Sequence, residues 1–508
     1  MQKVWKYIKK HTLLVFTICL IISRIPCIFS SLHGINCDEA AIDYNIFCIS
    51  EYGTDRYGNP FPVYFANQVS GQSALYTYLG VILTKLIGFS VEKCRLIKLV
   101  SEIITFIFGG RLIKVFFNKT TETIFYFLYI ICPYFFMMTG ISFDCDLIIP
   151  VFILCMYLME KCIQKGTTRW YVGLGICIGL LSYSYIIGIL MVPLFLLVHF
   201  FTDKNKKEFF LEVVITFIVN LPIGYFILTL LGIAPAIKTS FFTIAPVSQQ
   251  RLQDLGFSFD NLYRLKYCII TDPSFDFAGS SHFGTIYQIS VLFLIIALIY
   301  LLRNYKENKR FFLYLGIAVI PLLLIKEATS YNYTVLYYFL LALTAAGIAL
   351  LFHQYKTLGV ITIAGYLIFF LMFCQEYFTT NLFIYSDDAL IPVISKTETE
   401  QQIILDTTGV ILPECYIGLA LEANPKEIQY DNSSNAISFG NIHFNDYTHY
   451  KDYDVAILRN SGEYLYQQTF YSGLTDQQMQ EAAAYYMEQK YHLKEVLGYY
   501  IFTKEEQT

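Results

Sequence analysis

The sequence predicts a mainly α-helical, polytopic membrane protein with a small α/β domain at its C-terminal end. The 508 residues are 56% hydrophobic and 17% aromatic but only 15% charged, whereas soluble domains carry about 25% charged residues. Long apolar runs recur through the first 376 residues, and polar residues become more frequent after them. These features exclude a soluble enzyme, a disordered chain and a disulfide-rich secreted scaffold. The net charge of -4 offers no basic surface for nucleic acid.

Eleven apolar runs are predicted to cross the membrane as helices. The first, residues 13–32, follows four lysines and lacks a small-residue cleavage site, so we expect an uncleaved anchor. Several of the others are shorter than the ~20 residues that a bilayer requires, so their ends are approximate. The ten further spans are 95–117, 122–141, 147–163, 170–184, 186–201, 210–232, 286–303, 311–326, 333–352 and 357–376.

Residues 74–91 are apolar and nearly long enough to span, and the distribution of Lys and Arg decides their location. Cytoplasmic loops should hold the basic residues. If 74–91 lies along the outer interface, the basic loops near 111–119, 161–169, 204–207, 303–310 and 356 are all cytoplasmic; if it crosses, all move outside. The sequence therefore predicts an interfacial helix at 74–91. The same rule predicts a hairpin turning near 182–184, an even number of crossings there, and an N-terminus inside.

This topology predicts two domains. A transmembrane domain covers 1–376 and has outer loops at 33–94 and 233–285. Residues 377–508 form a small extracytoplasmic α/β domain, in which 403–406 and 454–459 are predicted buried strands. Residues 476–490 are predicted to form a helix capped by Thr475. The segment HLKEVLGYYIFTK is predicted to close the chain as a strand pair or one long strand.

Two acidic sites fall on the same face of the membrane in this topology. Asp38 and Glu39 follow the first span in GINCDEAAIDYN, and Asp144 and Asp146 lie in TGISFDCDLIIP at the outer mouth of the next hairpin. Carboxylates beside a membrane are costly unless they are solvated or used. A solvated loop explains the first pair without any function, and the N-terminus of a helix starting at Leu147 explains the second. Their common location was not used to derive the topology and favours a functional site.

Residues 34–80 carry motifs that together resemble a known family. They contain the Asp-Glu pair, a Tyr-Gly-x-Asp-x-x-Gly turn, a Pro-Val-Tyr-Phe run and a Leu-Tyr-x-Tyr-Leu run that begins the interfacial helix. The segments that carry the resemblance are 38–39, 52–58, 62–65, 75–79, 94–96, 143–147, 284–290 and 330–351. The chain is similar here to bacterial membrane glycosyltransferases of the C superfamily. These are relatives of protein O-mannosyltransferases and lipid A aminoarabinose transferases.

The resemblance implies a sugar transfer from a polyprenyl-phosphate donor, by a hexosyl- or pentosyltransferase. The acceptor hydroxyl does not ionise at neutral pH, so a carboxylate must take its proton in the transition state. Asp38 is the candidate base, and a neighbouring Glu39 or Asp144 would raise its basicity by like-charge repulsion. The same carboxylates are equally suited to orienting the acceptor or holding a divalent cation. The departing phosphate leaves as a stable anion and needs positive charge nearby.

The chain departs from the family pattern at three positions. One of them is Ala74, where many relatives have a Pro, and another departure affects donor binding. Many relatives have an Arg where this chain has Gly140, and Asp146 stands where they often have Asn. The donor phosphate therefore needs another cation. Its candidates are Arg56, Lys85 and Arg251, although a solvated or interfacial charge explains each of them equally well.

The histidines give little sign of a further site. His282 lies in an outer loop, where it is a candidate substrate contact. The other histidines lack ligand spacing, so no metal site and no cofactor is assigned.

The leading functional hypothesis is a multi-pass cell-membrane glycosyltransferase acting on the extracytoplasmic face. Its partners would be membrane lipid, a polyprenyl-phosphate sugar and an envelope glycan, lipid or protein acceptor, with no nucleic acid. The alternative is a lipid-linked sugar flippase or a secondary transporter, which should show inverted repeats and ionisable residues at the membrane midplane. The clustering of acids at one outer face favours the enzyme. A catalytically inactive envelope scaffold is the third hypothesis, kept open by Gly140.

Overall fold

The computed structural model describes residues 11–29, 34–67, 71–247, 250–268, 282–379, 390–395, 401–407, 410–431, 436–446, 448–459, 476–496 and 499–504. The chain divides into two compact units. The first comprises residues 1–32 and 62–382, and the second comprises residues 33–61 and 383–508. Each unit is described by itself below.

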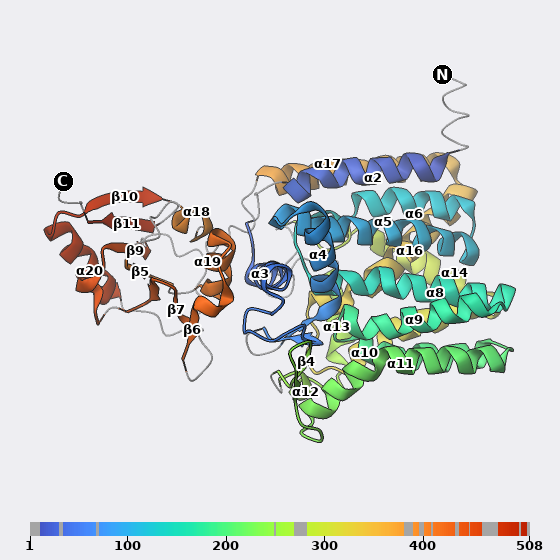
Figure 1. The fold of residues 1–508 in the computed structure, drawn as a ribbon. Helices are drawn as coiled ribbons and strands as arrows, with labels where there is room; N and C mark the ends of the chain where they lie inside the picture. Colours follow the sequence, from blue (N-terminus) through green and yellow to red (C-terminus); the bar gives the residue numbers. More distant parts are fainter. Residues whose placement is uncertain are drawn as a thin grey trace. The chain divides into compact units, whose positions relative to one another are not determined.

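The first unit is a bundle of long helices that run alongside one another (Figure 1). Each predicted span coincides with one of these helices, except that the span predicted at 122–141 is broken into two. The helices are α2 (Thr12–Phe29), α5 (Val91–Phe116), α6 (Lys119–Ile131), α7 (Pro133–Met138), α8 (Ile148–Lys165), α9 (Thr168–Ser184), α10 (Gly188–Thr202), α11 (Lys206–Leu230), α14 (Ser290–Arg303), α15 (Tyr305–Leu323), α16 (Thr334–Gln354) and α17 (Lys356–Thr379).

Four helical segments in the described part of the chain are long and apolar enough to cross a bilayer unaided. They are α2, α11, α17 and the segment Ser330–Gln354, which joins the 3-10 helix η3 (Ser330–Tyr333) to α16. The segment Ser330–Gln354 is also the most buried of the four, with 78% of its most apolar window inside the protein. It is therefore the central helix of the bundle. The number of crossings and the direction of the N-terminus stay predictions.

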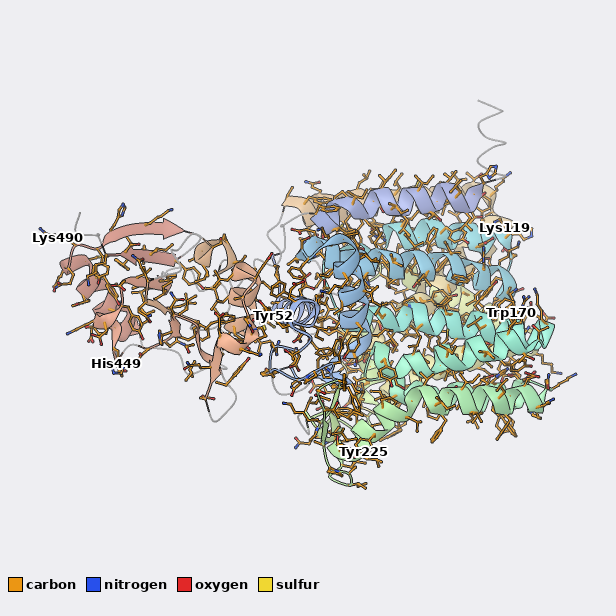
Figure 2. The ribbon with its side chains drawn as sticks, viewed as in Figure 1. Tyr52, Lys119, Trp170, Tyr225, His449 and Lys490 are labelled. Carbon is orange, nitrogen blue, oxygen red and sulfur yellow. The ribbon has the colours of Figure 1, made fainter. Side chains whose placement is uncertain are left out.

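The ends of the bundle agree with the charge-derived grouping of loops. Lys119 and Trp170 lie at one end of the bundle, and Tyr225 lies toward the other (Figure 2). Lys165 Nζ lies 5.7 Å from the ring centroid of Trp170, and Arg169 Cζ lies 4.9 Å from it. Basic and aromatic side chains together are typical of a membrane interface. The basic loops after α5 and α8 therefore share one end, as predicted.

Helix α4 (Ala74–Ile87) differs in direction from the spans. It begins after Ser73, ends at Gly88 and lies across the ends of the long helices rather than alongside them (Figure 1). With 14 residues it is too short to cross a bilayer. Its Ile82, Leu86 and Ile87 are exposed. This geometry supports the predicted interfacial helix at 74–91.

Small residues allow close approach of the helices α9 and α11. A Cβ atom on Gly179 would lie 2.5 Å from Val219 Cγ1, and one on Gly175 would lie 2.8 Å from the Glu212 carbonyl oxygen. Thr216 donates a hydrogen bond to the Gly175 carbonyl over 3.1 Å. Small residues with an interhelical hydrogen bond are a usual device of membrane helix packing.

The turn between α9 and α10 confirms the predicted break of the 170–201 run. Helix α9 ends at Ser184 and α10 begins at Gly188. A Cβ atom at Gly188 would lie 2.1 Å from the Leu181 carbonyl oxygen. The turn is therefore so tight that it requires glycine at this position.

The second unit contains a mixed seven-stranded sheet in the order β10-β11-β9-β5-β8-β7-β6. The central strand β5 pairs in parallel with both β8 and β9, and the remaining neighbours are antiparallel. Its strands are β5 (Ile403–Leu405), β6 (Ile428–Tyr430), β7 (Ala436–Phe439), β8 (Ile442–Phe444), β9 (Val455–Arg459), β10 (His492–Val496) and β11 (Tyr499–Thr503). Its helices are α3 (Cys37–Tyr52), α18 (Leu390–Ile394), α19 (Pro413–Leu421) and α20 (Asp476–Glu488).

The predicted elements of the C-terminal segment are present. The strands predicted at 403–406 and 454–459 are β5 and β9, and the helix predicted at 476–490 is α20. The final segment forms the strand pair β10–β11. Thr475, the predicted cap, lies outside the described residues. The structure adds one difference: residues 33–61, predicted as an outer loop of the membrane domain, group with the C-terminal residues.

Candidate functional site

The first acidic pair lies in the first turn of helix α3. The Asn36 side chain caps this helix by accepting a hydrogen bond from the Glu39 N–H over 2.8 Å. The Asp38 side chain is partly exposed, whereas Glu39 is fully buried. A helix N-terminus favours negative charge, so the fold accommodates both carboxylates there. The acidic pair that follows the first predicted span is therefore carried by a separate helix, α3.

Contacts from the C-terminal segment hold helix α3 in the second unit. The Tyr44 hydroxyl donates to the Ala423 carbonyl oxygen over 3.2 Å, and the Tyr416 hydroxyl donates to the Ile35 carbonyl oxygen over 3.1 Å. A Cβ atom on Gly418 would lie 2.3 Å from the Tyr44 ring. Glycine at 418 therefore allows α3 and α19 to pack closely. The two hydrogen bonds that support the helix of Asp38 join residues 379 and 381 positions apart in the sequence.

The Tyr-Gly-x-Asp-x-x-Gly motif is a turn that ends α3. Gly53 caps the helix with φ 70° and Gly58 has φ 75°, both in the left-handed region. The Asp55 carboxylate accepts hydrogen bonds from the N–H groups of Tyr57 at 3.0 Å and Asn59 at 2.7 Å. Burial raises the pKa of Asp55, although these hydrogen bonds oppose the shift. The residues of this motif therefore fix the turn.

Arg56 is buried within the second unit. Its guanidinium donates to Cys415 Sγ and to the Tyr57 hydroxyl, each over 3.1 Å, and lies 4.9 Å from the Tyr57 ring centroid. Burial raises the pKa of Glu414 above its ordinary value, although the charge of Arg56 opposes the shift. Only 1% of Arg56 is exposed. Arg56 is therefore buried among residues of the second unit, and its role as a phosphate ligand stays a prediction.

The second acidic site is built on the first unit. Asp144 begins the 3-10 helix η1 (Asp144–Leu147), and its carboxylate accepts a hydrogen bond from the Ser73 N–H over 2.7 Å. Ser73 belongs to strand β2 (Gln72–Ser73), which pairs with β1 (Tyr64–Phe65). The first outer loop therefore supplies a backbone donor to the second acidic motif. Asp144 is 7% exposed.

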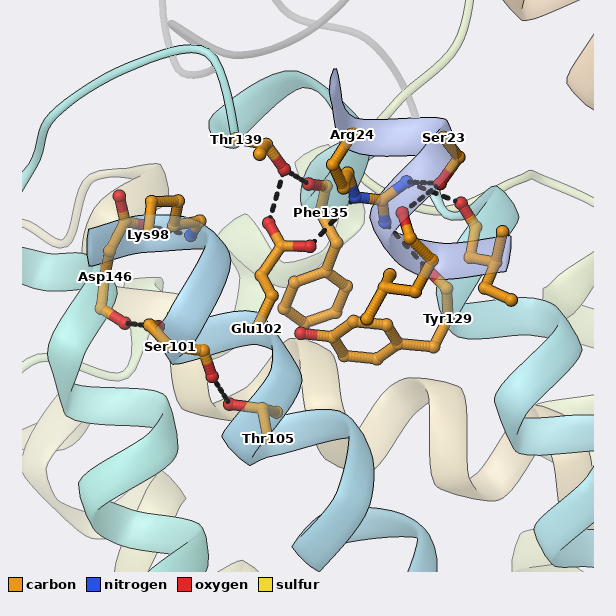
Figure 3. A network of polar contacts seen from close by, with 12 residues as sticks. Ser23, Arg24, Lys98, Ser101, Glu102, Thr105, Tyr129, Phe135, Thr139 and Asp146 are labelled. Carbon is orange, nitrogen blue, oxygen red and sulfur yellow. Dashed lines mark hydrogen bonds and ion pairs between the residues drawn. The ribbon is translucent and has the colours of Figure 1, made fainter. Parts of the chain in front are cut away.

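Asp146 is fully buried, and α5 neutralises and anchors it. Lys98 forms an ion pair with Asp146 Oδ1, and the Ser101 hydroxyl donates to the Asp146 carbonyl oxygen over 3.1 Å (Figure 3). The second carboxylate oxygen, Oδ2, has no hydrogen-bond partner among the described residues. Lys98 and Ser101 are three residues apart and so share one face of α5. Helix α5 thus fixes both the side chain and the backbone of η1.

A second buried ion pair extends this polar face of α5. Arg24 of α2 donates from Nε to Glu102 Oε2 over 2.9 Å, and the Thr139 hydroxyl donates to Glu102 Oε1 over 2.5 Å (Figure 3). Arg24 and Glu102 are at most 1% exposed. This group of side chains was not among the residues predicted from the sequence. Its signal was present, because charged residues inside predicted membrane spans mark functional or structural sites.

Arg24 also satisfies carbonyl groups freed where α6 gives way to α7. Pro133 has no N–H to offer the Tyr129 carbonyl, and the Tyr134 N–H donates instead to Thr285 O over 3.1 Å. The Arg24 guanidinium donates to the carbonyl oxygens of Tyr129 at 3.2 Å and Ile130 at 2.8 Å. Broken helices persist in a membrane only when such groups are satisfied again. The break turns the chain toward Asp144.

The backbone of α2 leaves little room for a side chain at position 140. A Cβ atom on Gly140 would lie 2.8 Å from the Cys27 carbonyl oxygen of α2. Arg24, one turn earlier on α2, is committed to Glu102 and to the helix break. The cation absent from position 140 is therefore not replaced by Arg24.

The remaining sequence candidates lie apart from this polar group. The Lys85 side chain is exposed in the last turn of α4. The exposed His282 pairs with Glu376 of α17, with Nδ1 at 3.3 Å from Oε2. Arg251 belongs to helix α12 (Gln250–Gln253), but its side chain lies outside the described part of the structure. Among the described residues, no group of three or more His, Cys, Asp or Glu is arranged to hold a metal ion.

The structure brings together Ser73, Asp144, Asp146 and Lys98, all on the first unit. Asp38, Glu39 and Arg56 belong to the second unit. The arrangement on the first unit can present the Asp144 carboxylate in a fixed orientation. The buried, neutralised Lys98–Asp146 pair lies in the same 3-10 helix and α5. Hydroxyl binding and proton transfer are the chemistry that such a carboxylate supports.

Helices, site and sequence together define a polytopic protein with a polar site at the ends of membrane helices. Residues 72–226 match the model of a family described as dolichyl-phosphate-mannose-protein mannosyltransferase. The matched range contains Ser73, Lys98, Glu102, Asp144 and Asp146, but not Asp38. No curated protein matches the chain.

Solved structures resemble the whole chain. ArnT from Cupriavidus metallidurans bound to undecaprenyl phosphate has a TM-score of 0.60 at 11% identity, over 97% of this chain and 98% of that one. Its apo state gives a TM-score of 0.58 over 96% and 97%. The archaeal oligosaccharyltransferase AglB from Archaeoglobus fulgidus, in complex with an inhibitory peptide and a dolichol-phosphate, has a TM-score of 0.51 at 14% identity, over 83% and 65%. The chain therefore has the fold of the C-superfamily membrane glycosyltransferases, as the sequence resemblance predicted.

Proposed function

We propose that the protein is a membrane glycosyltransferase that moves a sugar from a polyprenyl-phosphate carrier to a cell-envelope acceptor on the extracytoplasmic face. One observation carries the proposal: the segment that matches the mannosyltransferase family contains the buried, oriented Ser73–Asp144 and Lys98–Asp146 contacts. The likeness in fold to ArnT and AglB, whose structures contain polyprenyl or dolichol phosphates, supports a lipid-linked donor.

In this proposal Asp38 is the general base. Its place at the N-terminus of α3 gives it a rigid support, and its partial exposure leaves it accessible to an acceptor hydroxyl. The base would accept the hydroxyl proton while the anomeric C–O bond to the lipid phosphate breaks. Asp144, fixed by the Ser73 N–H, would orient a substrate hydroxyl. Lys98 and Asp146 would act through Asp144 by fixing η1, and so are positioning residues.

The test uses the purified full-length protein in lipid nanodiscs. Binding of undecaprenyl phosphate is measured first, because it does not depend on the identity of the sugar. Transfer is then measured with a panel of radiolabelled undecaprenyl-phosphate hexoses and pentoses and an extract of envelope glycans, lipids and proteins. We expect binding of the carrier phosphate and release of it from one donor with label appearing in an acceptor. Transbilayer movement of label without any transfer would favour the flippase instead.

A further inference from the structure

We propose that part of the second outer loop is embedded in the outer leaflet of the lipid bilayer. The part in question comprises residues 233–247 and 250–264 and is called the aromatic loop here. It contains strands β3 (Ile237–Lys238) and β4 (Thr243–Ile244) and helices α12 and α13 (Asp260–Arg264). This segment belongs to the outer loop predicted at 233–285. The proposal does not depend on the proposed function.

Large apolar side chains of the aromatic loop are exposed to an extent that water does not favour. Their exposed fractions are 70% for Ile233, 79% for Phe241, 65% for Phe257, 65% for Phe259 and 67% for Tyr263. Isolated apolar residues on a surface are ordinary, but a group of this size marks an interaction site or a membrane contact. The hydrogen bonds of the loop decide whether these side chains are held in place or are loosely attached.

Hydrogen bonds to the end of α15 hold the second half of the aromatic loop. The Asn261 side chain donates to the carbonyl oxygens of Leu322 at 2.8 Å and Ile325 at 2.7 Å. The Gly256 N–H donates to the Leu324 carbonyl oxygen over 3.1 Å. These bonds attach the loop backbone to the place where a predicted span ends. The side chains between them are therefore presented outward by a fixed backbone.

The tip of the β3–β4 hairpin is also defined. The Thr239 hydroxyl accepts hydrogen bonds from the N–H groups of Phe241 at 3.2 Å and Phe242 at 2.9 Å. Both phenyl rings are exposed at this tip. The base of the hairpin is buried, because Ile244 packs in one cluster with Phe226 and Leu230 at the end of α11. The hairpin thus presents two aromatic rings from a firm base.

The exposed apolar surface of the spans continues onto the aromatic loop, which is why lipid is the expected occupant. Helix α11 exposes a series of large apolar residues along its length, and Leu231 and Ile233 continue that series beyond its end. The series is Phe210, Val214, Phe217, Ile218, Leu221 and Leu228. Figure 1 shows β4 and α12 at one end of the bundle, reaching sideways past α11. A loop that continues the exposed apolar surface of α11 would meet the same lipid as α11 itself.

Basic residues accompany the aromatic side chains, as in interfacial anchors. Lys266 lies against Tyr263, with Nζ 3.8 Å from the ring centroid and 2.6 Å from the hydroxyl oxygen. Lys238 is exposed on β3. Aromatic side chains with nearby lysines suit the boundary between acyl chains and phosphates, where the rings are buried and the amines remain near phosphate. A protein partner would not require this continuity with α11.

An embedded loop would also set the depth of the second acidic site. The Val63 N–H donates to the Thr243 carbonyl oxygen over 3.0 Å, and the adjacent Tyr64 pairs with Ser73 in the β1–β2 ladder. Ser73 in turn donates to Asp144. A continuous backbone connection therefore runs from the hairpin to the carboxylate. This consequence rests on the proposed function, whereas the embedding itself does not.

Fluorescence quenching tests the embedding. The chain has two tryptophans, Trp5 and Trp170, so Trp5→Phe and Trp170→Phe give a background without tryptophan. Single Phe241→Trp and Phe259→Trp variants are then reconstituted in phosphatidylcholine vesicles, with and without bromine on the acyl chains near the headgroup. We expect roughly a twofold loss of emission in the brominated vesicles, because indoles prefer this interface. We expect little quenching of either variant by aqueous iodide.

The control is Met487→Trp in the same background, since Met487 is 55% exposed on α20 of the second unit. Its emission should fall with iodide and not with brominated lipid. Both loop variants exchange one exposed aromatic side chain for another, so the fold should be retained. The proposal would be overturned if iodide quenched the Phe241→Trp and Phe259→Trp variants as strongly as the Met487→Trp control, with no effect of brominated lipid.

Discussion

Arg24 donates a hydrogen bond from Nη1 to the carbonyl oxygen of Ile130 over 2.8 Å. The bond lies where Pro133 interrupts the helical hydrogen-bond pattern between α6 and α7. A charged side chain from the first span thus completes the backbone pairing of the third. The same guanidinium is neutralised by Glu102. This one residue joins α2, α5 and α6, and it supports the chain direction that leads to Asp144.

Replacing Arg24 by Met should strongly destabilise the first unit. The change leaves a buried Glu102 carboxylate without a cation and two carbonyl groups without donors, and removing one partner of a buried pair costs about 3–5 kcal/mol. Thermal unfolding in detergent should therefore shift to lower temperature. Arg24→Met combined with Glu102→Gln should recover part of the loss. Arg111→Met is the control, because Arg111 is exposed. Equal stability of the Arg24→Met and wild-type proteins would contradict the assignment.

Lys98 and Asp146 should act on transfer as a coupled pair. Lys98→Met leaves a buried unpaired carboxylate, and Asp146→Asn leaves a buried ammonium, so each single change should displace η1 and lower kcat. In the double variant neither charge remains, and the effects should be less than additive by about 1–3 kcal/mol. The affinity for undecaprenyl phosphate should stay within roughly twofold of the wild-type value, because changes at distant sites act independently. Additive losses would show that the pair does not position Asp144.

Asp38→Asn should reduce transfer by at least ~100-fold, the scale of general-base catalysis. Donor binding should change little, because a carboxylate does not hold a phosphate. The matched control is Glu51→Gln on the same helix, whose side chain is exposed. Asp43, which lies on the same helix, does not serve as a control because it is fully buried. A purified Asp38→Asn protein that transfers sugar at the wild-type rate would assign the base elsewhere.

Thiol labelling checks the topology. Single cysteines replace Glu51, Lys426, Lys204 and Lys306, all of which are exposed. A membrane-impermeant maleimide added to intact cells should label positions 51 and 426, and should label 204 and 306 only after lysis. The charge distribution of the loops is the physical reason. Labelling at 204 in intact cells without labelling at 426 would reverse the arrangement.

The Asp446–His449 pair in the second unit should titrate with displaced pKa values. Partial burial alone would raise the pKa of Asp446, but hydrogen bonds with Tyr453 and His449 outweigh it and lower the pKa. The hydrogen bond with Asp446 and its charge raise the pKa of His449. The stabilisation by Asp446 is lost as pH falls through its lowered pKa, and that by His449 is lost as pH rises through its raised pKa. Asp446→Asn should return the His449 pKa toward 6.5, measured by NMR titration; an unchanged value would contradict the pairing.

The helices of the first unit were predictable because each is a run of apolar residues, and burial in lipid requires little beyond length and composition. The loop grouping followed from Lys and Arg for the same reason. The break at Pro133 was missed because the apolar run continues through it without a change in hydropathy. The C-terminal strands β5 and β9 were predictable from short apolar runs between polar segments.

The polar contacts around Asp144 were not predictable, because their partners are far apart in the sequence. Arg24 and Glu102 are 78 residues apart, Lys98 and Asp146 are 48 apart, and Ser73 and Asp144 are 71 apart. Each residue alone is only a charge or a hydroxyl near a membrane. Only the packing of α2, α5 and η1 shows that they neutralise and orient one another.

The sequence by itself determined that this is a membrane protein, where its helices lie, which loops share an end and which carboxylates are candidates. Those properties depend on the hydrophobicity and charge of each segment, and each segment interacts with the bilayer largely on its own. The tertiary structure alone decided that α3, with Asp38, folds with the C-terminal residues, that Arg56 is buried, and that Asp146 is neutralised by Lys98. Such outcomes depend on which distant side chains become neighbours when helices pack. A buried charge without a partner is too costly, so burial requires that each charge find one.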